Sequence, residues 1–194
     1  PLLFRGMKCV SDSTQVERCV RLAIRHDIAL YAAHTNLDNA QGGVCHEMGH
    51  RLGLQEVEFL DPAPDGRSGS GIIGRLPQPM EAHAFLRQLK ATFGVESLQY
   101  AAARQQQVQR IALCGGAGDF LIDRAIAAEA DLFLTGEIGY HRFFGHDNDL
   151  WLAALSHYQS ERYTIDLMER IVYAAFPTLP IHKTRCNTNP IQYL

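Results

Sequence analysis

His46, Glu47 and His50 form the pattern H-E-x-x-H, which is typical of zinc hydrolases. Two histidines four residues apart face one metal from the same side of a helix, and the glutamate between them polarises a water molecule. A zinc site also needs a third ligand, but Glu56 stands at the position where a metzincin has histidine, and no Met-turn follows. We therefore interpret the three side chains as an exposed helix face and keep a zinc protease as the weaker alternative.

A second set of metal-ligand residue types follows three apolar stretches that are predicted strands. The six residues are His34 and Asp38, Glu137 and His141, and His157 and Glu161. Ligands of α/β proteins gather at the carboxyl ends of strands, so we expect a shared rim whose oxygen and imidazole ligands suit Zn, Mn or Fe. Asp38 or Glu161 has two oxygens with which to bridge two metals, although Asp38 as a simple helix cap is the alternative.

The glycine-rich stretch CGGAGD, residues 114–119, lies between a predicted strand and a predicted helix. Backbone amides at the start of a helix hold anions in many proteins. However, the stretch matches neither G-x-G-x-x-G nor a Walker loop, and a tight strand-to-helix turn explains the glycines equally well.

The apolar pattern along the chain predicts an α/β fold. The expected helices are 14–27, 42–54 and 79–94, and the expected strands are 28–34, 68–76 and one near Ile181. Residues 108–137 have the pattern of a strand–turn–helix–strand unit, and residues 149–176 that of a strand followed by a long helix. We expect mixed, partly parallel sheets flanked by helices, in one unit that spans residues 1–194.

Composition excludes several classes of function. The net charge of −3 gives no basic field for nucleic acid or a membrane surface, and no apolar run reaches 18 residues. The five cysteines are widely spaced and odd in number, which favours a reducing compartment, and with no visible signal peptide we expect a cytoplasmic protein.

Four blocks of the sequence, in this order, resemble those of a known family. They are HTNLDNAQGGV, GIIGRLPQPM, LCGGAG with ADLFLTGEIGYH, and SHYQSE. The family is that of the GTP cyclohydrolase 1 type 2 homologues, also called the NIF-like dinuclear-metal-centre family. The similarity runs through nearly the whole chain, and the short distance between the middle blocks indicates the form without an inserted domain.

This resemblance implies two divalent metal ions held by five side chains. Asp38, His157 and Glu161 match three of the ligands, and Ser156 stands where the family usually has glycine. The other two ligands are an adjacent His-His pair, which this sequence lacks. We expect that pair, with the first part of the family fold, upstream of Pro1, and weak or no metal binding without it. The alternative is that the chain is a degenerate member of the family.

His34, Glu137 and His141 match family positions that line the cleft, and the resemblance implies that they orient the ligands or face the substrate. It also implies a homohexameric ring. The resulting hypothesis is a metal-dependent hydrolase of a nucleotide or phosphoester whose catalytic residues are not identified. The alternative is a ring-forming metal-binding or interaction protein without turnover.

Overall fold

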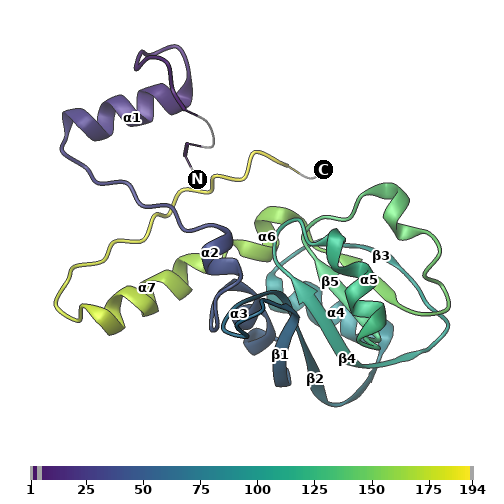
Figure 1. The fold of residues 1–194 in the computed structure, drawn as a ribbon. Coiled ribbons are helices and arrows are strands. Elements are labelled where there is room, and N and C mark those ends of the chain that lie inside the picture. Colours follow the sequence, from purple (N-terminus) through teal and green to yellow (C-terminus); the bar gives the residue numbers. More distant parts are fainter. Residues whose placement is uncertain (1, 4–5, 193–194) are drawn as a thin grey trace. The chain divides into compact units, whose positions relative to one another are not determined.

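The computed structural model describes residues 2–3 and 6–192. The chain forms two compact units, residues 1–37 and residues 38–194, and Figure 1 draws both.

The N-terminal unit contains helix α1, Gln15–Arg25, which begins where the Oγ1 of Thr14 accepts a hydrogen bond from the backbone N–H of Glu17 at 3.2 Å. Short helix α2, Thr35–Asp38, crosses into the second unit. The prediction of a buried strand at 28–34 is wrong. This stretch has no strand partner among the described residues, and its apolar side chains Ile28, Leu30 and Tyr31 are 55%, 59% and 77% exposed. A strand of this kind needs a neighbour to satisfy its backbone and cover its side chains.

The second unit is built on one six-stranded sheet in the order β1-β2-β4-β5-β6-β3. The strands are β1 Gln55–Pro62, β2 Gly69–Glu81, β3 Gln99–Ala101, β4 Gln107–Cys114, β5 Leu132–Thr135 and β6 Trp151–Ala154. Strands β4, β5 and β6 are parallel, whereas β1, β2 and β3 join antiparallel. The predicted mixed, partly parallel sheet is therefore confirmed.

The parallel strands are buried on both faces. Residues 111–114, 132–135 and 151–154 are all buried, which is the pattern of strands covered by helices on both sides. Their registers pair Cys114 with Thr135 and Thr135 with Ala154, so the three strands end in one row. The segments that follow two of these ends carry predicted site residues, 137 and 141 after β5 and 157 and 161 after β6.

The helices of this unit are α3 Val44–Arg51, α4 Ala82–Phe93, α5 Ile122–Ala127, α6 His157–Glu161 and α7 Thr164–Ala175, with 3-10 turns η1 Asp119–Leu121 and η2 Tyr140–Phe143 (Figure 1). Helix α3 lies against β2, where Gly49 allows the approach because a Cβ there would stand 2.7 Å from the Cδ1 of Ile72. Helix α4 begins at Glu81, whose carboxylate accepts from two backbone amides, and ends at Gly94 with φ 61°.

Two further expectations differ from the structure, and one strand was not predicted. The long helix predicted after β6 is divided into α6 and α7, and residues 55–62 form a strand that the pattern did not predict. No strand includes Ile181 in the described part of the chain. The predicted βαβ unit, by contrast, is present as β4, α5 and β5.

Candidate functional site

His157 is the centre of the candidate site at the carboxyl ends of the parallel strands. Its Nδ1 lies 2.9 Å from the Oε1 of Glu137, and its Nε2 lies 3.6 Å from the Oε2 of Glu161. Because a carboxylate accepts but does not donate, the bond to Glu137 assigns the proton to Nδ1 in the neutral ring. The unprotonated nitrogen is then Nε2, and its lone pair points toward the carboxylate of Glu161.

Gly116, in the turn after β4, has no side chain and so leaves room for the side chains of His157 and Glu161 beside this turn. The glycine has φ 64°, and a Cβ there would lie 2.5 Å from the Oε1 of Glu161 and 3.3 Å from the Nε2 of His157. Its N–H donates to the Oγ of Ser160 at 3.0 Å, and its carbonyl accepts from the Oγ1 of Thr135 at 3.1 Å. The turn is thus fastened both to α6 and to the end of β5.

The same hydrogen bonds decide between the two interpretations of residues 114–119. The N–H of Gly118 also donates internally, to the Oγ1 of Thr135 at 3.0 Å. With the amides of Gly116 and Gly118 both engaged, the stretch is a tight strand-to-helix turn and does not present these amides to an anion.

Two buried thiols, Cys45 on α3 and Cys114 at the end of β4, adjoin the site. A hydrogen bond with Cys45 raises the pKa of Cys114, as do burial and the negative charges near it, which include Asp38 and Glu161. The negative charges of Asp38 and Glu161 therefore both act on Cys114. The Cys114 thiol is accordingly held protonated.

The predicted ligand set is only partly assembled. Asp38, His157 and Glu161 are of the residue types that bind Zn, Mn or Fe, but no three His, Cys, Asp or Glu side chains within residues 2–3 and 6–192 converge as ligands of one ion.

The two predicted cleft histidines differ from Glu137 in their surroundings. His141 lies in η2 with its ring against Tyr140, at 5.4 Å between centroids, and does not join the His157 group. His34 belongs to the N-terminal unit, where its Nδ1 is 3.1 Å from the Oγ1 of Thr35.

The H-E-x-x-H residues do not form the exposed face that the sequence suggested. Glu47 is 6% exposed, and its two oxygens bind Arg51 Nε at 2.8 Å and Arg170 Nη2 at 2.5 Å. His46 is half-buried with its ring edge-on to Phe59, and only His50 is exposed. The prediction is therefore wrong for Glu47, because α7 covers this side of α3 and supplies the second arginine.

Sequence reasoning also missed three residues of the site, namely Cys45, Cys114 and Gly116. The cysteines are 69 positions apart and carry no shared motif, so only the packing of α3 beside β4 brings them together. Gly116 had a weak signal, since it follows Cys114 in a glycine-rich turn directly after a predicted strand.

The fold and site define an α/β protein with a candidate ligand group at the carboxyl ends of its parallel strands, the usual place for a site in this class. The chain belongs to the Duf34/NIF3 (NGG1p interacting factor 3) family, whose family model matches residues 1–190. It is 34% identical over 150 residues to a GTP cyclohydrolase 1 type 2 homolog of Lactococcus lactis, covering 76% of this chain and 56% of the relative. It is 36% identical over 148 residues to a protein of the same name from Streptomyces coelicolor, covering 73% of this chain and 51% of the relative.

Two solved structures have the same fold. A hypothetical protein of Staphylococcus aureus matches with a TM-score of 0.89 and 22% identity, over all of this chain and 78% of the other. A Bacillus cereus protein related to NIF3 matches with a TM-score of 0.84 and 19% identity, over all of this chain and 81% of the other. The chain thus spans little more than half of the two named relatives, and about four fifths of these structures.

One further property concerns the helices. No helix among the described residues combines the length and the apolar composition needed to cross a membrane.

Proposed function

We propose that this chain carries part of a divalent-metal centre and acts as a metal-dependent hydrolase on a nucleotide or phosphoester. The proposed ligands are Asp38, His157 and Glu161, with Zn, Mn or Fe as the metal. When bound, two such ions activate water and stabilise charge on the substrate. A cytoplasmic homohexamer is the proposed setting.

The observation that carries the proposal is the Glu137–His157–Glu161 arrangement. Metal-binding histidines commonly donate one ring N–H to a carboxylate, which orients the other nitrogen toward the metal. His157 has this geometry, with Nδ1 at 2.9 Å from Glu137 and Nε2 directed to the side of Glu161. Asp38 supports it, because its charge acts on the same Cys114 thiol as that of Glu161.

Metal content tests the ligand assignment. The purified chain is loaded with Zn or Mn, desalted and analysed by elemental mass spectrometry beside Asp38→Ala and His157→Ala. Asp65→Ala is the matched control, because Asp65 is a carboxylate of the exposed turn between β1 and β2. We expect the two site variants to lose metal and the control to keep it. Unchanged metal content in Asp38→Ala would contradict the assignment of Asp38 as a ligand.

Turnover tests the hydrolase. GTP and a panel of phosphodiesters are incubated with the Mn- or Zn-loaded chain, and products are followed by chromatography. Metal-dependent turnover that His157→Ala abolishes supports the enzyme. Metal binding without turnover across the panel would favour the alternative, a ring-forming metal-binding protein.

A further inference from the structure

A groove of about 440 Å³ opens beside His157 and Glu161. One wall is α6 with the start of α7, and the other is the C-terminal segment 184–191. Besides the two site residues, its lining is largely apolar and includes Tyr158, Ile165, Pro190 and Ile191. Such a surface binds the carbon skeleton or ring of a ligand better than it binds a charged group.

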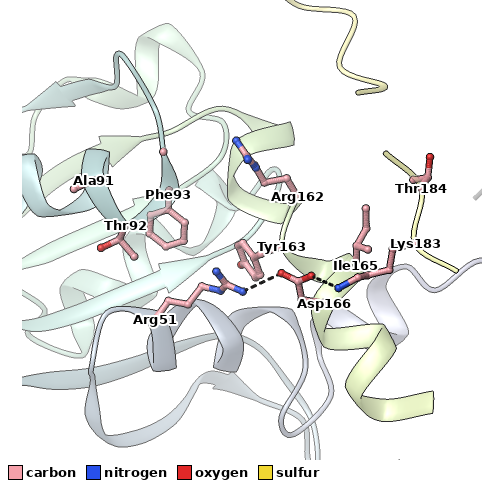
Figure 2. A pocket seen from close by; sticks show the side chains of 11 residues that line it. Arg51, Ala91, Thr92, Phe93, Arg162, Tyr163, Ile165, Asp166, Lys183 and Thr184 are labelled. Atoms are coloured by element: carbon pink, nitrogen blue, oxygen red, sulfur yellow. Dashed lines mark hydrogen bonds and ion pairs between the residues drawn. The ribbon is translucent and has the colours of Figure 1, made fainter. Parts of the chain in front are cut away.

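A second hollow, of about 400 Å³, adjoins the first and is cationic (Figure 2). Its lining contains three cations, Arg51, Arg162 and Lys183, against one carboxylate, Asp166. The lining thus carries two more positive than negative charges in a protein whose net charge is −3. An anionic group is the ligand that this balance favours.

The three cations are not equivalent. Asp166 lies between two of them, with oxygens 3.6 Å from Arg51 Nη2 and 3.1 Å from Lys183 Nζ. Arg162 has no side-chain hydrogen bond or ion pair with any residue in the described part of the chain. Figure 2 shows its guanidinium directed away from the Arg51–Asp166–Lys183 row, so its donors remain available to a ligand.

Arg162 also joins the two hollows. It lines both of them, together with Ile165 and Thr184. A molecule that reaches from one hollow to the other therefore passes this guanidinium, whose planar fork matches the oxygens of a phosphate.

We propose that the two hollows form one site for a phosphorylated ligand with an apolar or heterocyclic part. Arg162 binds the phosphate, and Ile165 with Tyr158 contacts the organic part, which lies beside His157 and Glu161. This inference rests on the proposed function and narrows its substrate class to phosphorylated molecules that carry a ring, such as nucleotides. In this arrangement the phosphate serves to bind the ligand, and the organic part lies next to the candidate metal ligands.

Calorimetric titration with AMP, adenosine and inorganic phosphate tests the inference. The chain is used as purified and again in EDTA, so that binding to bound metal is separated from binding to the side chains. Because charge-assisted hydrogen bonds contribute about 1.5–3 kcal/mol, we expect AMP to bind at least ~10-fold more tightly than adenosine. Arg162→Gln should remove this difference, while Arg87→Gln, an exposed arginine on α4, should keep it.

Ile165→Ser tests the apolar half, since Ile165 is 43% exposed and its replacement leaves the core intact. We expect it to weaken AMP several-fold and to leave inorganic phosphate unchanged. Two results would overturn the inference, namely wild-type AMP affinity in Arg162→Gln, or equal affinity of the wild-type chain for AMP and inorganic phosphate. The metal content of Asp38→Ala is measured in a separate experiment. The metal-ligand assignment and the phosphate site can therefore each fail while the other holds.

Discussion

The Nδ1 of His157 lies 2.9 Å from the Oε1 of Glu137, although the two residues are 20 positions apart and follow different strands. This contact fixes the ring so that Nε2 points toward Glu161. The effect of this contact on metal affinity can be measured with a substitution of Glu137 that keeps the shape of its side chain.

Glu137→Gln should weaken metal binding by about 10- to 100-fold, the usual effect of removing the carboxylate that orients a ligating histidine. The amide can still accept a hydrogen bond from Nδ1, but it lacks the negative charge that makes the ring a stronger metal ligand. Competition with a fluorescent chelator measures the affinity. Glu96→Gln makes the same change at an exposed glutamate after α4 and should bind metal as the wild type does. Equal affinity in all three proteins would show that Glu137 has no such role.

Gly116→Ala should disturb the site and the fold together. The new Cβ would stand 2.5 Å from the Oε1 of Glu161, and φ is 64°, which is unfavourable for alanine. Gly42→Ala separates the two causes, because Gly42 has φ 73° but nothing within 4 Å of its Cβ position.

For these two variants we expect Gly42→Ala to lower the free energy of unfolding by about 1 kcal/mol and to retain metal. We expect Gly116→Ala to lower it further and to lose metal, because Glu161 must move. Urea unfolding and metal analysis measure both effects, and full metal binding by Gly116→Ala would contradict the close packing.

Ser156→Gly should stabilise the protein. Ser156 has φ 130°, which L side chains rarely adopt and which costs on the order of 1–3 kcal/mol. Glycine relieves this strain, and replacing a serine cap by glycine costs only a few tenths of a kcal/mol. The cap here is the bond that the Oγ of Ser156 accepts from the N–H of Gln159 at 3.3 Å. The net gain should be about 1 kcal/mol in urea unfolding.

The matched variant is Ser156→Ala, which keeps the strained backbone and removes the cap. It should be less stable than the wild type by about 0.5–1 kcal/mol. A glycine variant no more stable than the alanine variant would show that the strain is not relieved.

The parallel strands were predictable because each contains a short run that is apolar or nearly so. Burial on both faces selects such runs, namely 111–114, 132–134 and 151–154. Strand β1 was not predictable, since its sequence QEVEFLDP is half polar and its register shifts between Gln55 and Glu58. The stretch 28–34 has the composition of a strand, but composition does not supply a pairing partner.

The site was predictable in its residue types and not in its contacts. The position of Glu161 one helical turn after His157 follows from sequence spacing alone. The contact of His157 with Glu137 depends on the parallel register of β5 and β6, and the contact of Cys45 with Cys114 depends on how α3 packs. Both are tertiary relationships, which local patterns do not encode.

Glu47→Gln should destabilise the protein by about 1–3 kcal/mol, because a buried carboxylate with two charged partners is replaced by a neutral amide. Glu47 binds Arg51 and Arg170 and thereby connects α3 to α7. Glu58→Gln is the control, since Glu58 is exposed and its oxygen is 3.8 Å from Arg110. The control should change stability by less than ~0.5 kcal/mol. Urea unfolding at neutral pH measures both, and equal stabilities would contradict a structural role for Glu47.

His46 should make the fold sensitive to mild acid. Burial lowers the pKa of its ring, and neither ring nitrogen has a hydrogen-bond partner among the described residues. The unfolded chain, with the ordinary histidine pKa of about 6.5, then takes up a proton at a pH where the folded chain does not. The stability that the neutral ring contributes is fully present above the unfolded pKa of about 6.5. It is lost as the pH falls from that value through the lower pKa of the folded chain. His46→Gln removes this contribution, so its free energy of unfolding should fall less than that of the wild type between about pH 7.5 and pH 5.5. Urea unfolding of both proteins at the two pH values measures the difference, and identical losses would show that His46 does not titrate with folding.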